Sequence, residues 1–138
     1  MKISDIKKIC VVGAGTMGAG IAQSCAQAGL RVSMMDIKEE FVKKAVERIK
    51  VALEDSIKRG KLTEQKMQNI LENISVTTDL NTAVKDSNLI IEAIFEDIAA
   101  KKELFRKMSA VCNESVIFAT NTSTLSITEM AKVTARED

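Results

Sequence analysis

The motif Gly13-Ala14-Gly15-Thr16-Met17-Gly18 directly follows a short apolar run and opens a segment of helical period. A glycine at its first position lets the chain turn sharply, and a glycine at its last position lets a helix lie close against a strand. The start of the chain is therefore predicted to form a strand, a tight turn and a helix, which is the first half of a parallel crossover unit.

The rest of the chain repeats this alternation of β-rich apolar runs and longer helical segments. We therefore predict an α/β protein with a Rossmann-type, doubly wound, mainly parallel sheet and helices on both faces. At 138 residues, the chain has the size of one domain, so residues 1–138 are expected to form this unit. The predicted strands are residues 8–12, 31–36, 74–77, 89–94 and 116–120.

Helices are predicted from apolar residues at helical spacing and from cap and stop signals. They cover about residues 16–28, a long segment from Phe41 to the stop at Gly60, a short segment capped by Thr63, residues 98–111, and a last turn that a capping box of Ser126 and Glu129 opens. The faces expected to be buried are Met17, Ile21, Cys25 and Ala28 in the first helix, Phe41, Ala45, Ile49, Leu53 and Ile57 in the second, and Leu104, Phe105, Met108 and Val111 in the fourth.

The glycine motif also predicts a phosphate-binding loop. Gly15 has no Cβ to block a pyrophosphate, and the helix N-terminus offers free N–H groups and a positive dipole end. Asp36, eighteen residues past Gly18, ends the second predicted strand, where its carboxylate can accept hydrogen bonds from an adenosine ribose. This pattern indicates NAD rather than NADP, with Lys38 as the one nearby cation, while FAD and S-adenosylmethionine proteins share parts of it and stay open.

Composition excludes several classes of chemistry. With no histidine, the chain has no imidazole base, no Ser-His or Cys-His pair and no histidine metal ligand. The three cysteines lack C-x-x-C spacing and lie in apolar patterns, so we expect buried thiols and no metal site. The 20 basic and 19 acidic residues are interleaved and there is no Trp or Tyr, so no nucleic-acid partner is expected.

The apolar runs of the sequence are only a few residues long. They are too short for a membrane-spanning helix, so no membrane partner is expected. The N-terminus has no signal-peptide pattern, which predicts a cytoplasmic protein.

In an open parallel sheet, a ligand lies across the carboxyl ends of the strands. The residues that follow the fourth and fifth predicted strands, 92–97 and 121–124, are therefore candidates for ligand contact. An alternative for Glu96 and Asp97 is simple capping of the next helix, and for residues 121–124 it is an ordinary polar turn.

Three parts of the sequence resemble the short-chain L-3-hydroxyacyl-CoA dehydrogenase family, most of all its bacterial 3-hydroxybutyryl-CoA branch. They are residues 11–18 with Asp36, residues 92–97 with Lys101, and residues 119–127, and together they span the whole chain. The run Asn-Thr-Ser-Thr-Leu-Ser-Ile at 121–127 is the most specific of them. The resemblance implies an NAD-dependent oxidoreductase that transfers a hydride between NAD(H) and C3 of a short-chain 3-hydroxyacyl-CoA or 3-ketoacyl-CoA.

The resemblance also implies roles for single residues. The glycine loop would hold the pyrophosphate, Asp36 the adenosine ribose, and Ser123 would hydrogen-bond the 3-oxygen of the acyl-CoA substrate. Lysines and arginines near the end of the long helix are candidate partners for coenzyme A phosphates, although a solvated helix face is the simpler explanation for each. The implied cofactor residues are Gly13, Ala14, Gly15, Thr16, Met17, Gly18, Asp36, Ala93, Ile94, Glu96, Lys101 and Asn121, and the candidate coenzyme A residues are Lys50, Lys58, Arg59 and Lys61.

In the family, the general base is a histidine paired with a glutamate in a segment beyond the position of residue 138, and a helical substrate and dimerisation domain supplies the rest. Neither is in this sequence. Because general-base assistance is worth ~10²–10⁴-fold, we expect these residues to bind NAD but to turn over substrate slowly or not at all. The full-length enzyme is expected to be a homodimer, and the fragment to self-associate through uncovered apolar surface.

The sequence leaves two alternatives. One is a stand-alone NAD(H)-binding sensor or scaffold, and the other is a different hydroxyacid dehydrogenase with the same glycine loop. A sensor has no use for a substrate-oxygen ligand such as Ser123, so the 121–127 run favours an enzyme.

Overall fold

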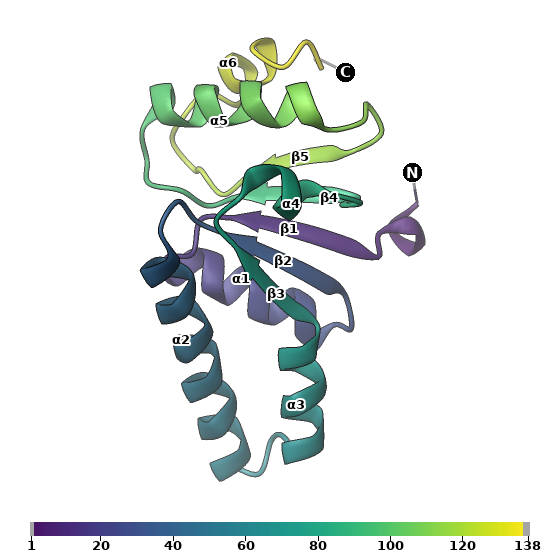
Figure 1. Ribbon diagram of the computed structural model, residues 1–138, viewed down its shortest axis with the longest axis vertical. Coiled ribbons are helices and arrows are strands. Elements are labelled where there is room, and N and C mark those ends of the chain that lie inside the picture. The colour runs from purple at the N-terminus through teal and green to yellow at the C-terminus, as the bar shows by residue number, and fades with distance from the viewer. Residues whose placement is uncertain (1, 137–138) are drawn as a thin grey trace.

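Five parallel strands form one sheet in the order β3-β2-β1-β4-β5, with helices on both faces (Figure 1). The computed structural model describes residues 2–136, so Met1, Glu137 and Asp138 of the expected domain lie outside the described residues. The predicted fold class is confirmed. The strands are β1 (Lys8–Val12), β2 (Arg31–Met35), β3 (Ile74–Thr77), β4 (Leu89–Glu92) and β5 (Ile117–Thr120).

The helices connect the strands in a regular succession. They are a short 3-10 turn η1 (Ile3–Asp5), α1 (Thr16–Gln27), α2 (Glu39–Lys58), α3 (Glu64–Glu72), α4 (Leu80–Val84), α5 (Ile98–Val111) and α6 (Ile127–Lys132). The strand order reverses direction between β1 and β4, which is where open α/β sheets bind their ligands. Within residues 2–136, no helix has both the length and the apolar character needed to cross a membrane.

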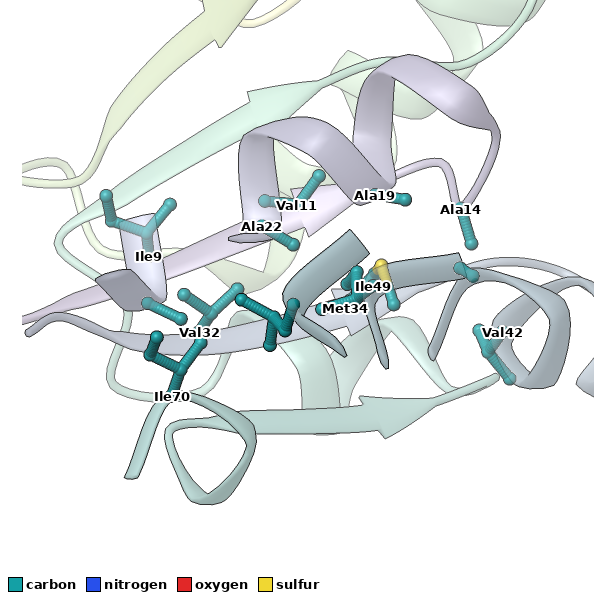
Figure 2. Packing of buried hydrophobic residues seen from close by; sticks show 13 residues of the cluster. Ile9, Val11, Ala14, Ala19, Ala22, Val32, Met34, Val42, Ile49 and Ile70 are labelled. Carbon is teal, nitrogen blue, oxygen red and sulfur yellow. The ribbon is translucent and has the colours of Figure 1, made fainter. Parts of the chain in front are cut away.

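Two hydrophobic cores lie on opposite faces of the sheet, because successive side chains of a strand point to opposite sides. Ile9 and Val11 pack with residues of α1, α2 and α3, whereas Cys10 and Val12 pack with residues of α4, α5 and α6. Figure 2 shows the first core, where side chains from the sheet and the helices gather between the two layers.

Several predicted helix boundaries are confirmed by the backbone. Gly29 (φ 83°) and Gly60 (φ 70°) have left-handed conformations just past α1 and α2, as the stop signals indicated. Thr63 accepts a hydrogen bond from the Lys66 backbone N–H (3.2 Å) and so caps α3. Ser126 caps α6 in the same way, but the side chain of Glu129 pairs with Lys102 at 2.6 Å, which differs from the predicted reciprocal capping box.

Three of the predicted strands were one or two residues longer than the observed ones. β2 ends at Met35, one residue before Asp36; β4 ends at Glu92, two residues before Ile94; and β5 begins at Ile117. The short helix α4 was not predicted, although Asp79 caps it with a 2.7 Å bond from the Thr82 N–H.

The predicted buried face of α1 was only partly right, since Ile21 and Cys25 are half-buried against the first core but Met17 and Ala28 are exposed. The helix buries Gly18, Ala19, Ala22 and Ala26, while Met17 is 57% exposed. A helix that lies very close to a sheet makes contact through its smallest residues, so the larger apolar side chains are displaced to the rim. A Cβ on Gly18 would lie 1.8 Å from the carbonyl oxygen of Gly13, which shows how close this approach is.

The other two predicted faces were partly right. On α2 the residues Ala45, Ile49 and Leu53 are buried, but Val42 takes the place of Phe41. On α5 the aromatic ring of Phe105 and the side chain of Met108 are buried, whereas Val111 is exposed. Their neighbour Lys101 is fully buried, which apolar spacing gave no reason to expect.

The two glycines of α1 give a matched test of the close approach. Gly18→Ala is expected to lower the free energy of unfolding by about 3 kcal/mol, since an added methyl collides with backbone that cannot move aside. Gly20→Ala is expected to raise it by about 1 kcal/mol, because its Cβ meets no atom within 4 Å and alanine favours the helix. Urea unfolding of both variants measures the difference, and equal effects would contradict the packing described here.

Candidate cofactor-binding site

The glycine loop leaves β1 at the point where the strand order reverses. Gly13 has φ +110°, and a Cβ there would lie 2.4 Å from the carbonyl oxygen of Ala93 in the next strand's loop. Gly13 and Gly18 are therefore required by the fold itself. They bring the loop, the end of β4 and the first turn of α1 into direct contact.

Gly15 differs from its two neighbours in the motif. It is the N-cap of α1 with φ −76°, a conformation open to any residue, and a Cβ there would meet no atom within 4 Å. The fold thus gives no reason for glycine at this position. The empty space lies beside the first turn of α1, whose N–H groups have no side-chain cap and are free to bind an anion.

A cavity of about 810 Å³ opens beside the loop, over the carboxyl ends of β1, β2 and β4. Of the residues implied by the resemblance, it brings together three of the loop, Asp36 and two that follow β4. These six are Gly13, Ala14, Gly15, Asp36, Ala93 and Ile94.

Asp36 lines this cavity and contacts the glycine loop. Its Oδ2 accepts a hydrogen bond from the Ala14 N–H, and its Oδ1 accepts one from the Ile37 N–H, both at 2.7 Å. These bonds orient the carboxylate and still leave acceptor capacity on both oxygens. The residue is thus held where a ribose hydroxyl beside the loop would meet it.

The cavity has a cationic side that sequence reasoning missed. Lys44 and Arg48 of α2 line it together with Phe41, and Lys107 and Glu103 line it from α5. The three α2 residues are spaced i, i+3 and i+7, so they share one helix face. That spacing was the available signal, but Phe41 was assigned to the buried face instead.

A second group of site residues lies at the same edge of the sheet but outside this cavity. Lys101 of α5 contacts two carboxylates: Glu92 at 2.9 and 3.0 Å, and Glu96 at 2.9 Å. We call these three residues the Glu92–Lys101–Glu96 triad. Only Glu96 reaches solvent, with its side chain 45% exposed, while those of Lys101 and Glu92 are 1% and 0% exposed.

The charges of the triad stabilise one another. Burial alone would lower the pKa of Lys101, but hydrogen bonds to Glu92 and Glu96 outweigh it and raise that pKa. Hydrogen bonds from Thr122 and Lys101 lower the pKa of Glu96. The ammonium and the exposed carboxylate are therefore both charged at neutral pH.

Glu96 also connects the loop after β4 to the loop after β5. Its Oε1 accepts hydrogen bonds from the hydroxyls of Thr122 and Thr124, the residues on either side of Ser123. Asp97, by contrast, caps α5 by accepting a hydrogen bond from the Ala100 N–H at 2.7 Å. This is the helix capping that the sequence analysis gave as the alternative to ligand contact. The side chains of Asn121 and Ser123 are exposed beside Glu96's partners.

The remaining candidates lie elsewhere. Thr16 and Met17 are exposed in the first turn of α1, outside the cavity. None of the candidate coenzyme A residues lines this cavity. Lys58, the last residue of α2, lies about 15 Å beyond the cavity residue Arg48 at 1.5 Å rise per residue. Its Arg59 is paired with Asp55 at 2.8 Å.

The cysteines take no part in the site. Burial raises the pKa of Cys10 to about 12, and it also raises the pKa of the half-buried Cys25 and Cys112, so all three are thiols at neutral pH. Among residues 2–136, no group of three or more His, Cys, Asp or Glu side chains is arranged to hold a metal ion.

Comparison with known proteins identifies the family. The sequence model described as 3-hydroxyacyl-CoA dehydrogenase, NAD binding domain, matches residues 8–138. A Bacillus subtilis (strain 168) protein named "Probable 3-hydroxybutyryl-CoA dehydrogenase" is 42% identical over 132 residues, which cover 96% of this chain and 46% of that protein. A 3-hydroxybutyryl-CoA dehydrogenase of Clostridioides difficile is 39% identical over 131 residues, with 95% and 46% covered.

The three-dimensional comparison agrees. The crystal structure of an (S)-3-hydroxybutyryl-CoA dehydrogenase from Ralstonia eutropha superposes with a TM-score of 0.92 at 40% identity, covering 96% of this chain and 46% of that one. The chain thus spans less than half the length of the relatives it matches. The resemblance first seen in the sequence is confirmed: this chain belongs to the family of NAD-binding domains of 3-hydroxyacyl-CoA dehydrogenases.

Proposed function

We propose that this chain binds NAD(H) across the carboxyl edge of its sheet as part of an enzyme that interconverts short-chain 3-hydroxyacyl-CoA and 3-ketoacyl-CoA. The main support for this binding site comes from Gly15. The fold does not require a glycine at this position, and Gly15 lies beside the uncapped N–H groups of α1. A pyrophosphate fits this space because a side chain there would fill it.

The cavity suggests how the two halves of the dinucleotide are divided. Asp36 accepts the hydroxyls of the adenosine ribose, and the apolar wall of Ile94, Phe95 and Leu104 takes the adenine. The other half extends past Gly13 toward Glu96 and Asn121. Glu96 provides an exposed, charged acceptor there, supported from below by Lys101.

For the reaction, NAD supplies a nicotinamide that accepts or returns a hydride at C3 of the acyl group. Ser123 donates a hydrogen bond to the 3-oxygen, where charge develops as the hydride is transferred. In the oxidation the hydroxyl proton must pass to a base. Because these residues contain no histidine, a base of the family's kind comes from a part of the enzyme outside them.

The proposal also covers the location of the protein, its partners and its oligomeric state. We infer a cytoplasmic enzyme without nucleic-acid or membrane partners, supported by three cysteines that form no disulfide. We further infer a helical second domain and a homodimer in the full-length enzyme. Exposed apolar side chains on the edge strands, Val76 of β3 and Ile117 of β5, support association through surfaces left open here.

Gly15→Ala tests the pyrophosphate position. The variant is expected to unfold at the same temperature as the wild type or slightly higher, because the new methyl meets no atom within 4 Å. Its Kd for NADH, measured by fluorescence titration, is expected to rise at least about tenfold, a loss of about 1.4 kcal/mol. Gly20→Ala, the same change on the exposed side of α1, serves as the control, and wild-type affinity in Gly15→Ala would refute the site.

Asp36→Asn tests the choice of dinucleotide. The wild type is expected to bind NADH better than NADPH, since a carboxylate repels the extra phosphate of NADPH. Removal of the charge at constant shape should reduce that preference by about tenfold. The control is Glu103→Gln, which neutralises a carboxylate of α5 that lines the same cavity. A preference that is unchanged in Asp36→Asn would show that the ribose lies elsewhere.

Ser123→Ala tests the catalytic role in the full-length enzyme. We expect kcat for acetoacetyl-CoA reduction to fall by about 10²–10³-fold, the usual cost of one oxyanion donor, with the Kd for NADH unchanged. Ser115→Ala, in the exposed turn before β5, is the control. The 138 residues alone provide the baseline, and turnover by them at the rate of the full-length enzyme would contradict the need for an external base.

A further inference from the structure

Glu92 is the most deeply buried charged side chain of the site. It is the last residue of β4, paired in register with Val12 of β1 and Thr120 of β5, and its side chain is 0% exposed. The alternation of β4 turns it to the same face as Ile90, toward α5. A carboxylate at such a position is costly unless its charge and its oxygens are all satisfied.

Both oxygens of Glu92 are satisfied by residues of the site. Oε1 accepts hydrogen bonds from the Ile94 N–H at 2.7 Å and from Lys101 at 2.9 Å. Oε2 accepts them from Lys101 at 3.0 Å and from the Thr120 hydroxyl at 2.6 Å. One carboxylate thus connects the end of β4, the first turn of α5 and the end of β5.

The distribution of contacts within the triad leaves Glu96 partly free. Lys101 donates to both oxygens of the buried Glu92 and also lies 2.9 Å from Oε2 of Glu96, whose side chain is still 45% exposed. If Glu92 were neutral, the ammonium would have Glu96 as its sole counter-charge and would draw that carboxylate inward. The exposed carboxylate would then have less capacity to accept a hydrogen bond from a ligand.

Stability alone does not account for a buried ion pair. Its desolvation cost offsets most of the attraction, and apolar residues of similar volume often serve as well or better. The pair in this chain lies directly beneath the exposed Glu96 and beside the loop that carries Ser123. Its location at the site, rather than in the middle of a core, needs a reason other than stability.

We propose that Glu92 is a positioning residue for the nicotinamide half of the dinucleotide: it holds Lys101 from below, so that Glu96 stays available to the ligand and braces the loop around Ser123. Glu92 acts through Lys101 and Thr120 and touches no ligand itself. The proposal rests on the proposed function, because it presumes that NAD(H) extends past Gly13 toward Glu96.

The test compares two probes in the 138-residue chain. NADH reports both halves of the site, whereas ADP carries only the adenosine half and the two phosphates. For Glu92→Gln, which keeps the shape and removes the charge, we expect the Kd for NADH to rise about tenfold and the Kd for ADP to stay within about twofold. Calorimetric titration measures both constants, and the emission of bound NADH reports the nicotinamide environment directly.

The control is Glu129→Gln. It removes the ion pair of Glu129 with Lys102, which also connects α5 to another element, but at the surface and without a residue of the triad. A general loosening of α5 would affect both variants and both probes. A change confined to NADH in Glu92→Gln therefore identifies positioning rather than stability.

A second variant covers the case in which Glu92→Gln does not fold. The double change Glu92→Gln with Lys101→Met removes both buried charges together, so no uncompensated charge is left in the interior. We expect it to fold and to bind ADP like the wild type. We expect it to bind NADH about tenfold more weakly, because Glu96 then loses the ammonium that holds it in place. Wild-type affinity for NADH in either folded variant overturns the role of Glu92, whereas a wild type that binds neither probe overturns the proposed function itself.

Discussion

The structure depends on the close backbone approach at the end of β1. Gly13 and Gly18 leave no room for side chains, with neighbouring carbonyl oxygens 2.4 and 1.8 Å from where their Cβ atoms would lie. This contact brings the loop, the first turn of α1 and the loop after β4 together. Because it does so at the point where the strand order reverses, it also creates the cavity in which Asp36 and the free N–H groups meet.

Charged side chains connect the strand ends in the other half of the carboxyl edge of the sheet. Three strand ends place Glu92, Thr120 and the glycine loop side by side, and α5 adds Lys101 from the adjoining face. The result is a polar network that runs from a fully buried carboxylate to an exposed one and on to the loop of Ser123. In this arrangement the fold and the site share their residues, so the chemistry of the site is built on the interactions that hold the strand ends together.

The sequence predicted the order of the strands along the chain, most helix ends and the position of the glycine loop. These are local properties: turns that need glycine, caps that need a hydroxyl, and runs whose period identifies helix or strand. Prediction was poorer where packing decides. The buried face of α1 was rotated toward Met17, because periodicity favours large apolar residues while the close contact selects Gly18, Ala19 and Ala22.

For the site, too, some residues were predicted from the sequence and others were recognised only in the structure. Asp36, Glu96 and Lys101 were predicted from motif and resemblance, and the structure shows Lys101 buried beneath Glu96 rather than lining the cavity. Lys44 and Arg48 were missed, because Phe41, which lines the cavity with them, was assigned to the buried face of α2. The role of Glu92 also needed the structure, since only strand pairing shows that its charge is shielded from solvent.

By itself, the sequence determined that the chain forms alternating strands and helices with a phosphate-binding loop and no histidine, because these follow from local conformation and residue type. The tertiary structure decided which helix faces are buried, which cations surround the cavity and how the three charges of the triad are shared. These features arise from contacts between segments far apart in the chain, and a one-dimensional pattern does not contain the distances on which those contacts depend.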